Sequence, residues 1–196
     1  DTKRVFLTFD DGPSPVTSKI LDILKQENVK ATFFILGSNV DSRKDVVKRM
    51  YEEGHYLANH GYSHTYSKIY SSPQSVLDEY NECNDKVKNA IEVPDYNSHL
   101  FRFPGGLAGG KYAEIKKEAK ELLLQNNIVN VDWNALTGDA ETNNLSVEFE
   151  MTRLTETMES KNSLVILMHD AAAKSVTADA LPQIIAKLKE EGYEFK

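Results

Sequence analysis

The chain has 196 residues, a net charge of −7 and 40% hydrophobic content, which fits one globular domain. This acidity and the sparse clustering of Lys and Arg disfavour nucleic acid as a partner, because phosphate binding relies on clustered cations. No apolar run reaches the roughly 18 residues that a membrane span needs, and the single Cys83 excludes an intrachain disulfide.

Short apolar runs alternate with longer amphipathic segments along the chain. The apolar runs predict strands, and the segments with apolar residues at helical spacing predict helices. In chain order we expect strand 4–9, helix 16–28, strand 31–36, helix 42–54, strand 56–60, helix 72–92, strand 99–103, helix 111–127, strand 128–133, helix 146–160, strand 163–169, helix 178–192 and a last strand at 193–196. This alternation predicts one α/β domain with a parallel sheet, either a barrel or an open doubly wound sheet.

Ionisable side chains follow the C-terminal ends of several predicted strands. In parallel α/β folds the strand ends and the loops after them carry the chemistry. We therefore expect these side chains to meet at one edge of the sheet and to form the functional site. They are Asp10 and Asp11, His60, Arg102, Asp132 and His169.

The segment "NHGYSH" places His60 and His64 four residues apart. On a helix or a helical turn these positions share a face, so both imidazoles could reach one metal ion, although the spacing alone also fits two surface histidines. Asp11 adds a carboxylate, and two histidines with one carboxylate leave positions open for water and substrate. An ion on Asp11 would offset the repulsion from Asp10, which could then accept a proton from water; the alternative is a simple Asp-Gly turn.

Other residues fit catalytic or pocket roles around this cluster. His169 ends the apolar run "LVILMH" and could act as a general acid, with Asp139 orienting its ring. Arg102 could fix the Asp10 carboxylate, although a surface ion pair is the alternative. Trp133 and Leu167 are either walls of an apolar pocket or ordinary core residues.

Five motifs occur in a fixed order: "TFDDGP", "HGYSH", "RFPGG", "WNALTGDA" and "LMH". With them the whole chain resembles the polysaccharide deacetylase family, the NodB-homology domain of carbohydrate esterase family 4. The resemblance implies a distorted (β/α) barrel with about seven parallel strands and surrounding helices, formed by residues 1–196 as a single domain. It implies the base Asp10, the metal ligands Asp11, His60 and His64, the tether Arg102, the general acid His169 with its partner Asp139, and Leu167 in the acetyl pocket.

Two positions depart from the family pattern. Gly105 stands where the family usually has Tyr, and Ala140 stands where it usually has Trp. The resemblance implies that the Gly105 N–H still binds the oxyanion. A side-chain wall of the groove is lost at Gly105, and Ala140 opens the site further, so we expect a more open site.

The resemblance implies a metal-dependent hydrolase that removes N-acetyl groups from N-acetylglucosamine units of a polysaccharide and releases acetate. Peptidoglycan is the expected polymer, followed by chitin. The expected cofactor is one divalent ion, Zn²⁺ first, with Co²⁺, Ni²⁺ or Mn²⁺ as alternatives. The alternative functions are an O-acetyl xylan esterase, a catalytically inactive cell-wall-binding domain, and a phosphodiesterase or nuclease, which the acidic balance disfavours.

Both ends of the chain fall in or near predicted strands. We therefore expect a catalytic domain excised from a longer exported bacterial protein. It is expected to act as a monomer, outside the cell or at the cell wall, with a membrane anchor in a preceding segment.

A few residues lie outside this constellation. We predict that His55 and His99 are structural or surface residues. The lysines of "EIKKEAKE" are predicted to cover a solvated helix face, and Cys83 is predicted to be a partly buried residue on a helix.

Overall fold

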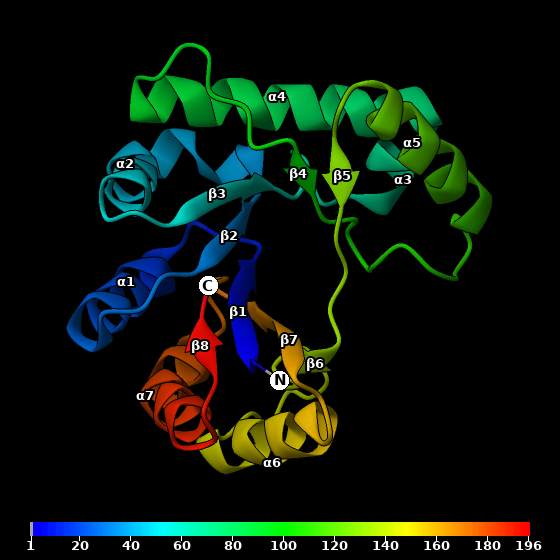
Figure 1. Ribbon diagram of the computed structural model, residues 1–196. Coiled ribbons are helices and arrows are strands. Elements are labelled where there is room, and N and C mark those ends of the chain that lie inside the picture. Colours follow the sequence, from blue (N-terminus) through cyan, green and yellow to red (C-terminus); the bar gives the residue numbers. More distant parts are fainter. Residues whose placement is uncertain (1) are drawn as a thin grey trace.

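The strands form one curled parallel sheet in the computed structural model, which describes residues 2–196. The strand order is β5-β4-β3-β2-β1-β7-β6, and β8 pairs with Arg4 and Val5 of β1. The edge strands β5 and β6 do not close the curl, so the sheet is an incomplete, distorted barrel as expected (Figure 1). The strands are β1 Arg4–Asp10, β2 Thr32–Ile35, β3 Tyr56–Asn59, β4 Leu100–Phe101, β5 Val129–Asn130, β6 Ala135–Leu136, β7 Ser163–His169 and β8 Glu194–Phe195.

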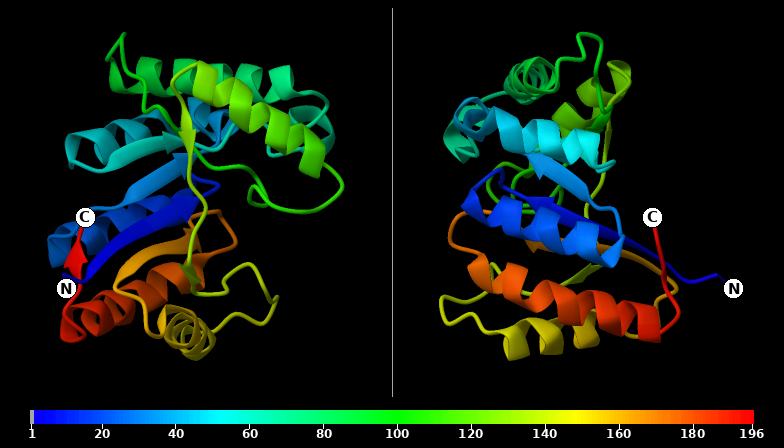
Figure 2. Two further views of the ribbon diagram at one scale, coloured as in Figure 1. Left: turned by 45° about the vertical axis from the view of Figure 1, so that its right-hand side comes forward. Right: turned by 90° about the vertical axis from the view of Figure 1, so that its left-hand side faces the viewer.

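The helices cover the outside of the curled sheet, as two further views show (Figure 2). Three long helices begin where the sequence places a serine: the hydroxyls of Ser14, Ser72 and Ser146 each accept a hydrogen bond from a backbone N–H in the first turn. The helices are α1 Pro15–Glu27, α2 Lys44–Glu52, α3 Tyr66–Ile69, α4 Pro73–Ile91, α5 Ala113–Gln125, α6 Val147–Met158 and α7 Ser175–Glu190, with 3-10 turns at Gly37–Asn39 and Asp41–Arg43.

The sheet differs from the prediction on its β4–β6 side. The predicted strand 99–103 pairs over only two residues, and the predicted strand 128–133 ends at Asn130. The reason lies in Arg102, whose guanidinium donates hydrogen bonds to the carbonyls of Val131 and Asp132, which a longer strand would use to accept from a neighbour. The short strand β6, which the sequence analysis missed, pairs with β7 after this interruption.

Two hydrophobic clusters hold the fold together. The larger one lies between the sheet and helices α1, α2, α4, α6 and α7, and includes the stacked rings of Phe9 and Phe33. The smaller one joins α3, α4 and α5 to Phe101 and Phe103. Among residues 2–196, no helix combines the length and apolarity that a bilayer crossing requires.

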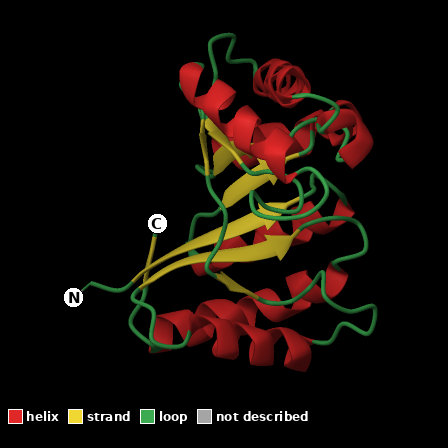
Figure 3. Cartoon of the chain, turned by 90° about the vertical axis from the view of Figure 1, so that its right-hand side faces the viewer, coloured by secondary structure: helices red, strands yellow, loops and turns green. Residues whose placement is uncertain are grey.

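The parallel register brings the strand ends to one edge of the sheet. Asp10 of β1 lies beside His169 of β7, and Asn59, just before His60, lies beside Phe101, just before Arg102. The strand arrows point to this edge, while both ends of the described chain lie at the opposite edge (Figure 3). The expectation that the polar strand ends converge is therefore confirmed for Asp10, His60, Arg102 and His169. It is wrong for Asp132, whose carboxylate accepts from the Leu107 N–H instead.

Candidate active site

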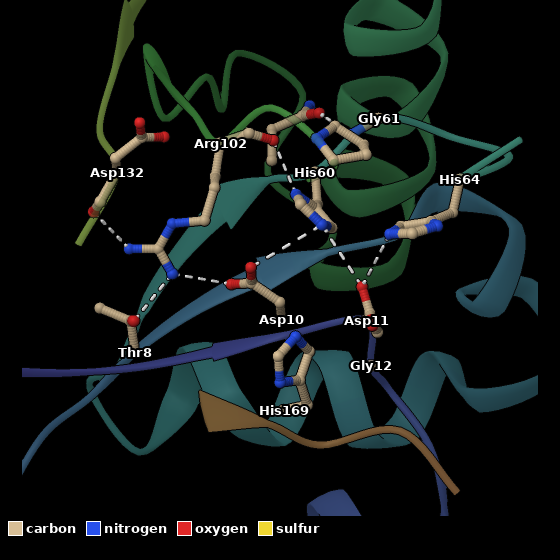
Figure 4. Close-up of polar contacts among 12 residues, drawn as sticks. Thr8, Asp10, Asp11, Gly12, His60, Gly61, His64, Arg102, Asp132 and His169 are labelled. Atoms are coloured by element: carbon tan, nitrogen blue, oxygen red, sulfur yellow. Dashed lines mark hydrogen bonds and ion pairs between the residues drawn. The ribbon is translucent and has the colours of Figure 1, made fainter. Parts of the chain in front are cut away.

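Asp11, His60 and His64 form a cluster of three potential metal ligands. Asp11 Oδ1 lies 3.3 Å from His60 Nε2 and 3.5 Å from His64 Nε2 (Figure 4). The three ligand atoms all lie within 4.8 Å of one another. Two nitrogens and one carboxylate oxygen are a donor set that suits Zn²⁺ in a catalytic site, because a fourth position remains for water or substrate.

The contacts of His60 prepare its Nε2 atom to bind a cation. His60 is 2% exposed, and its Nδ1 lies 2.6 Å from the carbonyl oxygen of Arg102. A carbonyl can only accept, so Nδ1 carries the hydrogen, and in the neutral ring the lone pair of Nε2 faces Asp11. Burial also lowers the pKa of His64, which favours its neutral, ligating form.

Asp11 fits the same role. Its buried Oδ1 atom has no hydrogen-bond partner among the described residues, which a bound cation would supply. Burial raises the pKa of this carboxyl, but the nearby imidazoles of His60, His169 and His64 outweigh burial and lower the pKa to about 2. The carboxylate is therefore ionised, and the residues present fit a divalent ion.

The loop from His60 to His64 is not helical, which corrects the expected i, i+4 geometry. Gly61 and His64 both have positive φ, at +84° and +55°, and this turn rather than a helix face brings the two rings together. Glu79 of α4 supports the turn by accepting hydrogen bonds from the backbone N–H groups of Tyr62 and Ser63. No sequence signal identified Glu79 in this role.

Asp10 is bound by a buried arginine, as predicted. The Asp10 carboxylate is 3% exposed and receives a 2.9 Å hydrogen bond from Arg102, which is itself fully buried. Arg102 also donates to Thr8 and stacks over the ring of Phe34 at 4.1 Å. The other Asp10 oxygen lies 3.8 Å from His60 Nε2, so one carboxylate face is held and the other faces the metal-ligand cluster.

His169 and Asp139 form the predicted pair. His169 Nδ1 lies 2.7 Å from Asp139 Oδ1, and the His169 backbone N–H donates to Asp139 Oδ2 at 2.8 Å. Burial disfavours the charged ring of His169, but the hydrogen bond and charge of Asp139 outweigh burial and raise its pKa to about 9. The ring is therefore a proton donor at neutral pH.

Asp170, which the sequence analysis did not select, lies beneath the loop that carries Asp10 and Asp11. Its carboxyl accepts hydrogen bonds from Gly12 N–H at 3.0 Å and from the Thr17 hydroxyl at 2.7 Å. A Cβ on Gly12 would overlap this carboxyl, so glycine is required there by close contact. Burial raises the pKa of Asp170 to about 7. Its position directly after His169 was the only sequence signal.

The three potential metal ligands, Asp10 and His169 line one pocket of about 450 Å³, in which Trp133 and Leu167 form apolar walls as predicted. Gly105 also lines it, with φ at +81°. The expected gap beside Gly105 is filled, because the Tyr66 hydroxyl lies 2.5 Å from the position of a Cβ on Gly105. Tyr66 therefore replaces the missing wall on this side, whereas Ala140 lines the pocket with its small side chain.

The carbonyls on both sides of Gly105 are anchored. The Tyr70 hydroxyl donates to the Pro104 carbonyl at 2.7 Å, and Lys116 Nζ donates to the Gly106 carbonyl at 2.8 Å. Lys116 is only 5% exposed, so the prediction that the lysines of this helix are all solvated is wrong for Lys116. These anchors fix the orientation of the backbone at Gly105.

The two histidines predicted to lie outside the site, His55 and His99, are structural or surface residues, as expected. His55 is buried, and its Nδ1 accepts a hydrogen bond from the Ala31 N–H; burial lowers its pKa to about 4. His99 is exposed. Cys83 lies on a helix, α4, as predicted, but it is fully buried rather than partly buried, and burial raises the pKa of its thiol.

Known proteins similar to this chain in sequence and structure are polysaccharide deacetylases and esterases. A family profile described as polysaccharide deacetylase matches residues 1–125. The chain is 34% identical to a peptidoglycan-N-acetylglucosamine deacetylase of Bacillus cereus, over 100% of this chain and 69% of that protein. It is 36% identical to the peptidoglycan-N-acetylglucosamine deacetylase PgdA of Listeria monocytogenes, over 98% of this chain and 37% of that protein. The solved structure of a Streptococcus mutans CE4 esterase superposes with a TM-score of 0.90 at 36% identity, covering 100% of this chain and 85% of that one.

Proposed function

This chain belongs to the polysaccharide deacetylase family of hydrolases, and we propose that it removes N-acetyl groups from N-acetylglucosamine units of peptidoglycan with the help of one divalent metal ion. The observation that carries the proposal is that the adjacent carboxylates of Asp10 and Asp11 have different partners. Asp11 faces two histidines that can share a cation, while Asp10 is held by Arg102 beside them. A ligand and a base side by side are what metal-assisted hydrolysis requires.

The first half of the reaction is attack of water on the acetyl carbonyl. A Zn²⁺ ion held by Asp11, His60 and His64 would lower the pKa of water and polarise that carbonyl. Asp10 accepts the proton of the attacking water, because Arg102 holds its carboxylate towards the same cluster.

The second half is departure of the amine. An amine anion is a poor leaving group, so the nitrogen must be protonated as the C–N bond breaks. His169 lies in the same pocket and, with its pKa raised to about 9, carries the required proton. The Gly105 N–H, on its anchored loop, donates to the oxyanion of the tetrahedral intermediate.

The proposed polymer rests on the relatives. The Bacillus cereus and Listeria monocytogenes proteins carry the name peptidoglycan-N-acetylglucosamine deacetylase, and the chain spans 69% and 37% of their lengths. Action on peptidoglycan would place the protein outside the cell, at the wall. The monomeric state and the metal Zn²⁺ stay predictions, which light scattering and metal analysis of the purified protein test.

An O-acetyl ester, with xylan as the expected polymer, is the second candidate substrate, and the likeness to a CE4 esterase favours an ester. An alkoxide leaves more readily than an amine anion, so an esterase depends less on a general acid. The strong His169–Asp139 pair therefore supports the amide substrate over the ester.

The test is acetate release from N-acetylglucosamine oligomers, purified peptidoglycan and acetylated xylan. Chelated protein is compared with the same protein reloaded with Zn²⁺ or Co²⁺. Metal-dependent release from the first two substrates supports the proposal, and their relative rates identify the polymer. Release from xylan alone would replace the amide by the ester, and no release from protein with one bound ion per chain would indicate an inactive wall-binding domain.

A further inference from the structure

A second buried acid lies behind the His169–Asp139 pair. Glu150 of α6 is 0% exposed, and its Oε2 lies 3.3 Å from the hydroxyl oxygen of Thr177 on α7. The same hydroxyl lies 2.8 Å from Asp139 Oδ2. Thr177 therefore bridges two carboxyl groups, one of which contacts the proposed general acid.

The number of available protons determines how Glu150, Thr177 and Asp139 are hydrogen-bonded to one another. Thr177 has one hydroxyl hydrogen and cannot donate to both carboxyl groups at full strength. Asp139 is the ionised partner of His169 and lies nearer, so it receives that hydrogen. The longer contact to Glu150 is then a hydrogen bond only if Glu150 carries a proton and donates it to Thr177.

The surroundings of Glu150 favour this protonated form. Oε1 of Glu150 has no hydrogen-bond partner among the described residues, and an ionised oxygen in that position would be costly. Burial and the charge of Asp139 raise its pKa to about 7 against the opposing effects of the Thr137 and Thr177 hydroxyls and the charge of Lys174. Lys174 uses its Nζ to donate to the Asp139 carbonyl at 2.7 Å.

We propose that Glu150 is a positioning residue for deacetylation, which donates through Thr177 to the Asp139 carboxylate and thereby fixes His169 as the proton donor. The inference rests on the proposed function, because it assigns a further residue to the general-acid side of that site. With Glu150 donating, the Thr177 hydroxyl keeps donating to Asp139, which also accepts from the backbone N–H and the ring Nδ1–H of His169. Without this donor, the Thr177 hydroxyl keeps only its contact with Asp139, so its rotation is less constrained.

The test uses the metal-loaded protein and four main variants. Thr177→Val removes the bridge, Glu150→Leu removes the donor, and Glu150→Gln keeps a donor. Glu148→Gln is the matched control, because it removes one carboxylate from an exposed position of the same helix. Thr177→Ser, which keeps the hydroxyl, is added in case the valine variant folds poorly. Each protein is assayed on N-acetylglucosamine oligomers and on p-nitrophenyl acetate, whose leaving group needs no proton.

We expect Thr177→Val and Glu150→Leu to lower kcat on the oligomers about tenfold, comparable to the loss of other supporting hydrogen bonds at an active site. They should change kcat on the ester less than twofold, and Glu150→Gln, Thr177→Ser and Glu148→Gln should stay within twofold on both substrates. Equal losses on the two substrates, or a Glu150→Gln variant as impaired as Glu150→Leu, would overturn the proposal.

A spectroscopic readout separates this inference from the proposed function. The proton on His169 Nδ1, bonded to Asp139, should give a far-downfield ¹H NMR signal, identified by its absence in Asp139→Asn. The signal should move in Thr177→Val and Glu150→Leu and stay in place in Glu148→Gln. If the wild-type protein releases no acetate, the proposed function fails while this comparison still decides the positioning role; an unmoved signal in both variants would refute the role itself.

Discussion

Asp139→Asn should switch off the proposed general acid without removing it. Asparagine keeps the shape of the side chain but cannot balance the charge of the His169 imidazolium. The raised pKa of His169 comes from the hydrogen bond and charge of Asp139 working against burial. In the variant, burial acts with less opposition, so the pKa of His169 should fall from about 9 to its ordinary value near 6.5 or below.

The size of the effect follows from the protonated fraction. At pH 8 a group with a pKa of about 9 is about 90% protonated, whereas one with a pKa of about 6.5 is about 3% protonated. Turnover of N-acetylglucosamine oligomers at pH 8 should therefore fall about 30-fold, and the alkaline limb of the kcat profile should move down by about 2.5 pH units. Hydrolysis of p-nitrophenyl acetate should change little.

The assay is the pH dependence of kcat on both substrates for the wild-type and variant proteins at equal metal content. NMR titration of the His169 ring in the same two proteins gives the pKa directly. An alkaline limb that stays in place in the variant would refute the assignment of His169 as a general acid held by Asp139. A parallel loss on both substrates would point to a structural defect.

Four further changes separate the roles of the other site residues. Asp10→Asn should lower turnover at least about 100-fold while the protein keeps one ion per chain. His60→Ala, in contrast, should lose the ion in metal analysis. Loss of metal from the Asp10 variant would reverse the assignment of base and ligand. Arg102→Met leaves the buried Asp10 carboxylate without its partner and should lower the free energy of unfolding by about 3–5 kcal/mol in urea titrations, and a loss below about 1 kcal/mol would contradict this. Tyr66→Ala should raise KM for oligomers about fivefold through loss of an aromatic wall, with the similarly exposed Tyr51→Ala as control; an equal rise in both would exclude a specific role.

Much of the site could be predicted because it consists of polar residues placed directly after apolar strands. Asp10, His60, Arg102 and His169 each end or follow a strand, and the parallel register alone brings their backbones to one edge. Asp139 was found through its motif, and the structure places its carboxylate on His169. Strand periodicity and the order of the motifs therefore carry most of this information.

The missed features depend on contacts between distant segments. Tyr66 fills the space beside Gly105 across 39 positions of sequence, and Glu79 supports the histidine loop from another helix. Glu150 reads as an ordinary charged residue of an amphipathic helix, yet it lies fully buried against Thr177. Periodicity shows which face of an element is buried, but it cannot show which polar group meets which across the core.

The adjacent aspartates show how one backbone feature separates two functions. In a regular strand, neighbouring side chains point to opposite faces, which would carry Asp10 and Asp11 apart. Asp10 keeps strand geometry and faces Arg102, whereas Asp11 has a φ of +81°, a backbone conformation that residues other than glycine rarely adopt. The Asn39 side chain donates to the Asp11 carbonyl, and Asp170 accepts from the N–H of the next residue, so both sides of the turn are fixed. The strained turn directs the second carboxylate to the two histidines while the first stays with the arginine, and this separation allows one carboxylate to bind a cation and the other to accept a proton.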